Sequence, residues 1–238
     1  MTANDLKAAL QTYVRPGSAE VLGRFFKTGE GQYGAGDVFI GVRVPQTRAV
    51  CKQFKDLSLD EVQKLLDSDI HEHRLAGLIL LSTAYPKATA EVKQQIFDLY
   101  LKNVYAGRVN NWDLVDLSAE FIIGPHLEKR SRELLITLAK SDKLWERRVA
   151  IISTFYFLRH KDASTTLQIA EILLHDPEDL IQKAVGWMLR EMGKRVDVAL
   201  LVEFLQAHAA TMPRTMLRYA IEHLSAEQKL HFMEMKKK

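Results

Sequence analysis

The chain has 238 residues, 47% hydrophobic and 26% charged, which excludes a disordered protein and favours a globular unit with a continuous apolar core. Its net charge of +3 permits a polyanionic partner without requiring one. No apolar run approaches the ~20 residues of a membrane span and the start lacks a secretory signal, so we expect a cytoplasmic protein without membrane contact.

Composition predicts an all-α fold, because glycine (12) and proline (6) are scarce and residues that favour helices dominate. Apolar residues recur at spacings of three and four from Leu6 to Phe232. The interruptions are short, as in "RPGS", "YPKAT", "HDPED" and "TMPRT". We therefore predict one domain over residues 1–238, present as a monomer.

In the N-terminal part, "GEGQYG" matches a dinucleotide-binding fingerprint through Gly29, Gly31 and Gly34. The preceding "AEVLGRFFKT" predicts a helix where that fold needs a strand, so we interpret the glycines as a surface loop. Cys51 is interpreted as a small core residue. No two of the eight histidines have i,i+4 spacing, and we expect neither a metal nor a cofactor.

Three stretches resemble one another. They are "SDIHEHRLAGLILL" from Ser68, "SDKLWERRVAIIST" from Ser141 and "DPEDLIQKAVGWML" from Asp176. Each passes from a polar turn into a charged and then an apolar helix, in frames at multiples of roughly 35 residues, as in HEAT-like repeats. This pattern predicts a curved α-solenoid whose concave groove can hold a long partner such as DNA.

Next in the chain, "VNNWDLVDLSAEF" has a tryptophan and an aspartate on the polar side of a predicted helix. On a helical wheel, Trp112 lies about 140° from the centre of the apolar arc, and Asp116 lies nearly opposite that arc. The arc consists of Leu114, Val115, Leu117, Phe121 and Ile122. Asn110 and Asn111 can cap this helix, which would place Asp116 in an early turn that favours an ionised carboxylate. The alternative is that Trp112 packs against the next helix and Asp116 is solvated.

Arg148 is a charge within an apolar stripe, surrounded by Trp145, Val149, Ile152, Phe155 and Tyr156. A buried guanidinium needs an anionic partner. That partner is either an internal carboxylate or a phosphate held through two hydrogen bonds. Arg147 points elsewhere and is expected to be solvated.

Trp187 also lies off its apolar arc, by about 130°. That arc consists of Ile181, Val185, Met188, Leu189 and Met192. Lys183 and Arg190 flank Trp187, and an indole between two cations is typical of a nucleic-acid contact surface. The alternative is a tryptophan between repeats with solvated charges around it.

The stretches "NNWDLVD", "WERRVAIIS" and "IQKAVGWMLRE", with "GVRVP" nearer the N-terminus, resemble the AlkD family of alkylpurine DNA glycosylases. The resemblance implies a HEAT-like solenoid that releases 3-methyladenine and 7-methylguanine from double-stranded DNA without base flipping. It implies catalytic roles for Asp116, Trp112 and Trp187, and DNA contact by Arg148 beside Lys183 and Arg190. The alternatives are a DNA-binding solenoid without catalysis and a protein scaffold.

Overall fold

The computed structural model describes residues 1–235, and the regular elements of this part of the chain are helical. A single isolated bridge joins Val38 to Ile70. The prediction of an all-α fold is confirmed. None of the helices in the described part is long and apolar enough to cross a bilayer.

Contacts divide the chain into two compact units, Met1–Ile122 and Ile123–Lys238. The first contains α1 (Ala3–Gln11), α2 (Ser18–Phe25), α3 (Val44–Gln53), α4 (Leu59–Leu66), α5 (His71–Ala84), η1 (Tyr85–Lys87), α6 (Ala90–Tyr105) and α7 (Trp112–Asp116). Helix α8 (Ala119–His126) contains the boundary. The second unit continues with α9 (Glu133–Ala139), α10 (Leu144–Ser153), α11 (Phe155–Arg159), α12 (Ser164–Ile172), α13 (Asp179–Arg195), α14 (Val198–His208), α15 (Arg214–Ala220) and α16 (Ala226–Glu234).

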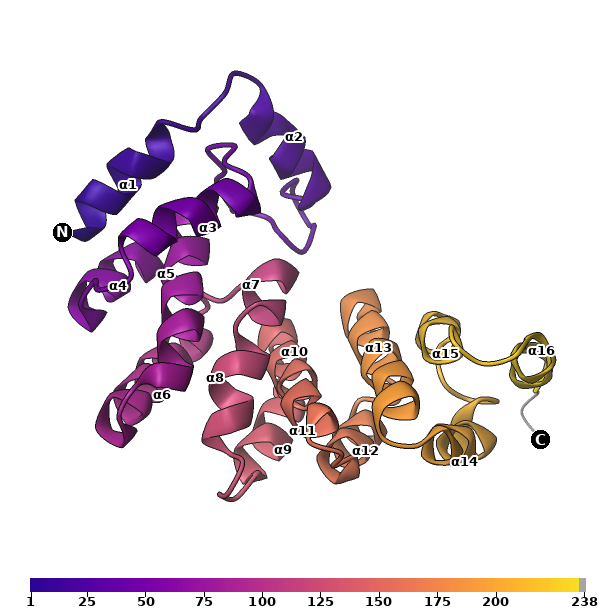
Figure 1. Ribbon diagram of the computed structural model, residues 1–238. Coiled ribbons are helices and arrows are strands. Elements are labelled where there is room, and N and C mark those ends of the chain that lie inside the picture. Colours follow the sequence, from indigo (N-terminus) through magenta and orange to yellow (C-terminus); the bar gives the residue numbers. More distant parts are fainter. Residues whose placement is uncertain (236–238) are drawn as a thin grey trace. The chain divides into compact units, whose positions relative to one another are not determined.

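Helix α5 is the centre of the first unit, where it packs against α3, α4, α6 and α7 (Figure 1). Every residue from His71 to Leu81 is buried. A helix buried on all sides has little amphipathic character, so its polar residues need partners from other segments. The first turn of α5 contains four such residues in a row, which makes it the polar centre of this unit.

Helix α13 has the same role in the second unit, where it packs against α10, α11, α12, α14 and α15 (Figure 1). Its Gly186 allows α15 to approach closely. A Cβ atom at this position would lie 2.4 Å from the carbonyl oxygen of Met216 and 2.6 Å from the Cβ of Tyr219. Trp187, the next residue of α13, lies beside Phe155 of α11.

The three similar stretches begin their helices in the same way. In each stretch, the side chain of the first residue accepts a hydrogen bond from the backbone N–H two residues later. The backbone carbonyl oxygen of that first residue accepts a second hydrogen bond, from the side chain of the residue six positions later. The first set joins Ile70 to Ser68 (3.2 Å), Lys143 to Ser141 (3.1 Å) and Glu178 to Asp176 (2.9 Å). The second joins Arg74 to Ser68 (2.9 Å), Arg147 to Ser141 (3.0 Å) and Gln182 to Asp176 (3.0 Å). The predicted passage from a polar turn into a helix is confirmed for all three.

Within each unit, the packed helices are one to three positions apart in chain order, so each helix contacts near neighbours in the sequence, as in an α-solenoid. The curvature, the concave groove and the single-domain organisation stay predictions.

Candidate functional site

The segment with Trp112 and Asp116 forms two helices instead of the one expected. Helix α7 ends at Asp116 and α8 begins at Ala119. Between them, the Ser118 hydroxyl donates to the Leu114 carbonyl, and its N–H bonds to Val115. A serine that binds the preceding turn in this way competes with helix continuation.

This break corrects two predictions. Asp116 is the last residue of a five-residue helix, so the expected early-turn position and its dipole argument are wrong. Phe121 was assigned to the apolar arc but is 41% exposed, because the break changes the helical phase. Leu114 and Val115 are fully buried, as predicted.

Trp112 is half-buried against aromatic rings at the end of α2. Its indole stacks on Phe26, with ring centroids 5.3 Å apart, and meets the edge of Phe25 at 6.0 Å. Phe25 is 62% exposed, so one side of this aromatic group faces solvent. Trp112 therefore packs beside an aromatic group that is partly exposed to solvent. Asp116, four residues later, is also half-buried.

The two asparagines before α7 have different roles. Asn111 caps the helix, as predicted, because its Oδ1 accepts the N–H of Trp112 at 2.9 Å. Asn110 does not cap it. Its side chain accepts a hydrogen bond from Arg74 at 3.2 Å and donates to Asp37 at 3.4 Å, which turns it toward α5.

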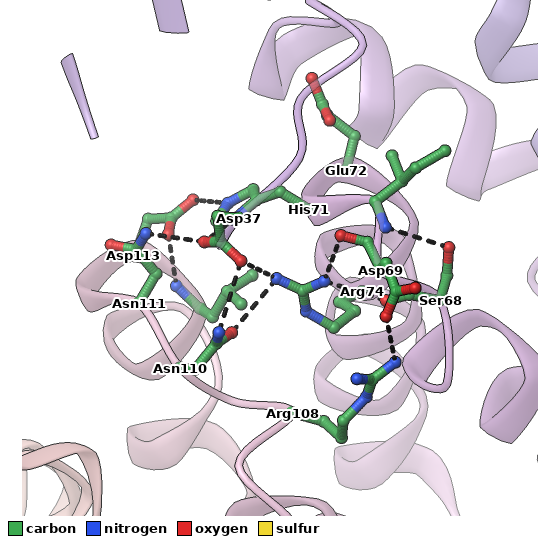
Figure 2. Close-up of polar contacts among 12 residues, drawn as sticks. Asp37, Ser68, Asp69, His71, Glu72, Arg74, Arg108, Asn110, Asn111 and Asp113 are labelled. Carbon is green, nitrogen blue, oxygen red and sulfur yellow. Dashed lines mark hydrogen bonds and ion pairs between the residues drawn. The ribbon is translucent and has the colours of Figure 1, made fainter. Parts of the chain in front are cut away.

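A buried group of four charged side chains lies between the start of α7 and the first turn of α5; it consists of Asp37, His71, Arg74 and Asp113 and is here called the ionic quartet (Figure 2). His71 Nδ1 lies 3.1 Å from Asp37 and its Nε2 lies 2.9 Å from Asp113. Arg74 also donates to Asp37. All four side chains are 10% exposed or less. Because both ring nitrogens face carboxylates, His71 donates from both and is an imidazolium.

For two members of the quartet, His71 and Asp37, the neighbouring groups outweigh the effect of burial on the pKa. Burial alone would lower the pKa of His71, but the carboxylates of Asp113 and Asp37 outweigh this effect and raise the pKa to about 9. Burial alone would raise the pKa of Asp37, but hydrogen bonds and charges from His71, Arg74 and Asn111 lower it to about 2. With two anions and two cations, the quartet has no net charge near neutral pH.

Aromatic rings connect the quartet to Trp112 by a second route. The imidazole of His71 stacks on Phe39 at 4.4 Å, Phe39 stacks on Phe26 at 5.0 Å, and Phe26 stacks on Trp112. Stacked rings of this kind contribute beyond the area they bury. The loop after α2 therefore lies between α5 and the indole.

Glu72 holds that loop against the start of α5. Its carboxylate accepts hydrogen bonds from the backbone N–H groups of Ile40 (3.1 Å), Gly41 (2.8 Å) and Val42 (3.1 Å). Gly41 has φ +86, and a Cβ there would lie 2.6 Å from the Cβ of Ser18. Only glycine suits this position, which explains why "GVRVP" begins with glycine.

In the second unit, Arg148 is 5% exposed, so its predicted burial is confirmed. It donates to the carbonyl oxygen of Leu180 at the start of α13, at 2.6 Å. Arg147 is not solvated as expected. It forms a largely buried ion pair with Asp176 at 2.7 Å, because its place six residues after Ser141 directs its side chain across the turn.

Trp187 is half-buried beside Phe155, with ring centroids 5.8 Å apart. The guanidinium groups of Arg159 and Arg195 lie over the ring of Phe155, at 4.7 and 4.9 Å. Helices α11 and α13 thus form a mixed cationic and aromatic group next to Trp187. Such a group is chemically suited to a phosphate and a sugar or base face.

The two cations that flank Trp187 in sequence have acidic neighbours. Lys183 forms an ion pair with Asp179 at 2.6 Å, and its side chain is 39% exposed. Arg190 is paired with Glu191 at 3.3 Å and with Glu222. Lys183 is the more accessible of the two, because the side chain of Arg190 is 18% exposed.

Among the described residues, no cluster of His, Cys, Asp and Glu side chains could hold a metal ion. A cavity of about 550 Å³ lies between α3 and α5, and Cys51 and Ile79 are among the residues that line it. Trp112 and Asp116 are not among them. The candidate residues on α7 therefore do not line that cavity.

The family model described as DNA alkylation repair enzyme matches residues 6–224. The chain belongs to this family. A solved structure described as a predicted DNA alkylation repair enzyme from Enterococcus faecalis is similar to this chain, with a TM-score of 0.69 and 18% sequence identity. The similarity covers 91% of this chain and 99% of the other, and at this identity it supports the fold. None of the curated proteins matches the chain.

For this DNA alkylation repair family member, the sequence predictions missed the ionic quartet. One signal was present: "HEHR" precedes "LAGLILL", so four polar residues begin a helix that has little polar surface further along. That signal could have indicated buried polar side chains near Ser68. Their partners, Asp37 and Asp113, come from distant segments and could not be read from spacing.

Proposed function

We propose that this protein is a DNA glycosylase of base excision repair that hydrolyses the N-glycosidic bond of positively charged alkylated purines in double-stranded DNA. Its expected substrates are 3-methyladenine and 7-methylguanine. One observation carries the proposal: in a member of the DNA alkylation repair enzyme family, α7 leaves Trp112 and Asp116 half-exposed while Leu114 and Val115 between them are fully buried.

The substrate's own charge simplifies the chemistry. A purine alkylated at N3 or N7 is already cationic, so the bond to the sugar can break with a neutral base as leaving group. A general acid is therefore unnecessary. What needs stabilisation is the sugar, which develops oxocarbenium character as the base departs.

Asp116 is the proposed stabiliser of that sugar. A carboxylate next to the developing cation lowers the energy of the transition state, and it can orient or deprotonate the attacking water. Trp112 and Trp187 are each proposed to offer a π-face to the DNA and to exclude bulk water, with roughly 1–2 kcal/mol for each desolvated contact. Both indoles are half-buried, so part of each ring is accessible for such a contact.

Arg148, Lys183 and Arg190 are the proposed DNA contacts, and their surroundings suggest different contributions. Arg148 is held by Leu180 in the interior, so it would present its guanidinium in a fixed orientation. An exposed ion pair such as Lys183 with Asp179 is weak, so a phosphate can replace its acidic partner. Arg190 would have to loosen two ion pairs before it could bind a phosphate.

Recognition without base flipping, which the resemblance to the AlkD family implies, is compatible with the same chemistry. Many enzymes that act on a base extrude it into a pocket that reads its edge. If selectivity comes from the charge and lability of the lesion, contacts to the backbone and sugar are enough. Neutral lesions such as uracil should then remain in the DNA.

The decisive experiment is incubation of the purified protein with methylated duplex DNA, followed by chromatography of released bases. We expect free 3-methyladenine or 7-methylguanine, and no uracil from a uracil-containing duplex. Asp116→Asn should lose most excision while it retains duplex binding, and Asp142→Asn, at an exposed carboxylate before α10, should behave as wild type. Excision by Asp116→Asn at the wild-type rate would refute the assigned role.

Binding assays separate the alternatives if no base is released. Affinity for the duplex that falls steeply with salt would indicate a DNA-binding protein without catalysis, because phosphate contacts release counterions. Failure to bind duplex at low salt would instead favour a protein scaffold.

A further inference from the structure

Helix α7 needs external support to present Trp112 and Asp116 in one orientation. It has five residues, and helices this short are not stable by themselves in water. The residues on both sides of Trp112 supply this support. Asn111 donates to Asp37 at 3.0 Å and Asp113 accepts from His71 at 2.9 Å, so the start of α7 is attached at two positions, at its N-cap and in its first turn (Figure 2).

The quartet joins three segments that are distant in sequence. Asp37 ends the glycine-rich loop, His71 and Arg74 belong to the first turn of α5, and Asp113 belongs to α7. Helix α5 is the buried centre of the first unit, so it provides a rigid base. The orientation of α7 therefore depends on charges that cancel only when all four groups are present and ionised.

Removal of one member has a predictable effect. Loss of the Asp113 charge leaves the quartet with a net positive charge in the interior, which is unfavourable unless water or a rearrangement compensates. The nearest element that can move is α7, because it is short and lies at the edge of the quartet. Trp112 would then lose its stacking geometry, and the Asp116 carboxylate would shift with it.

We propose that His71 and Asp113 are positioning residues for Asp116: they hold α7 in the orientation that excision requires without contacting the DNA. The inference rests on the proposed glycosylase function, since it assigns the reacting group to α7. Displacement of a catalytic group by about 1 Å can reduce a rate on the order of 100-fold. A defect in this quartet should therefore appear in the chemical step and not in DNA binding.

The test compares Asp113→Asn and His71→Gln with two controls in the same unit. Asp69→Asn removes a carboxylate whose side chain is 88% exposed, and Val62→Ala weakens the core at α4. Each protein is assayed at 25 °C, under conditions where circular dichroism shows it folded. Single-turnover excision and the Kd for a methylated duplex are measured separately.

We expect Asp113→Asn and His71→Gln to slow excision by about 10-fold to 100-fold, with Kd changed by less than about 3-fold, and both controls to excise at the wild-type rate. A group with only a structural role would lower stability and leave the rate of the folded protein unchanged. The wild-type rate should also fall as the pH rises through about 9, where the His71 imidazolium loses its proton between Asp37 and Asp113, while the His71→Gln rate stays low and flat.

Hydrogen exchange gives a readout that does not depend on activity. Amides in the peptide covering residues 109–118 should exchange faster in Asp113→Asn than in wild type, with α13 unchanged. Wild-type excision by both quartet variants, or unchanged exchange of that peptide, would overturn the positioning role alone. If the wild-type protein releases no base from methylated duplex, the glycosylase function itself fails and the inference fails with it.

Discussion

The charge state of His71 makes the stability of the first unit depend on pH in a specific way. Its pKa rises from 6.5 to about 9 in the folded chain, which corresponds to about 3 kcal/mol of stabilisation. Because the folded pKa is the higher one, this contribution is fully present below pH 6.5 and is lost as the pH rises through 9. Replacement by glutamine removes it at every pH.

The free energy of unfolding of wild type and His71→Gln, measured by urea denaturation between pH 6 and pH 9.5, tests this reasoning. The difference between the two should be largest near pH 6 and should shrink by about 3 kcal/mol toward pH 9.5. Both proteins share all other titrating groups, so the change in the difference reports on His71. A difference that stays constant within about 0.5 kcal/mol would show that His71 is not a cation held between Asp37 and Asp113.

Three further predictions concern other parts of the chain. Arg147→Ala leaves the Asp176 carboxylate, 4% exposed, without its guanidinium, and calorimetry should show a loss of about 3–5 kcal/mol; a loss typical of surface pairs would contradict a buried ion pair. Gly41→Ala combines φ +86 with a close approach to Ser18 and should cost more than about 1 kcal/mol in urea denaturation, whereas unchanged stability would contradict the strain. Burial raises the pKa of the Cys51 thiol to about 12, so a thiol reagent at pH 8 should modify it only after unfolding, and rapid labelling of the native protein would disprove its burial.

Local patterns predicted well what depends on neighbours in sequence. The helical class followed from composition and apolar spacing, and the polar turns at Ser68, Ser141 and Asp176 each begin a helix as expected. Burial of Leu114, Val115 and Arg148 followed from the apolar stripes. These features arise from the periodicity of a helix, which the order of residues alone determines.

The same reasoning failed where a single local contact broke the periodicity. The helix that a continuous wheel extends through Phe121 ends at Asp116, where Ser118 bonds back to the preceding turn, so the wheel misplaced Phe121 and the position of Asp116 within its helix. Arg147 was assigned to solvent because a wheel shows direction and not the partner that lies there.

Sequence by itself determined the helical class of this protein, the polar turns that begin three of its helices, and the family to which the chain belongs. Only the tertiary structure decided that His71 lies between Asp37 and Asp113 and that Asn110 binds the same group. These partners are separated by 34 to 73 positions in the chain. A buried charge selects its partner by proximity in space, and that proximity exists only once the glycine-rich loop, α5 and α7 have packed together.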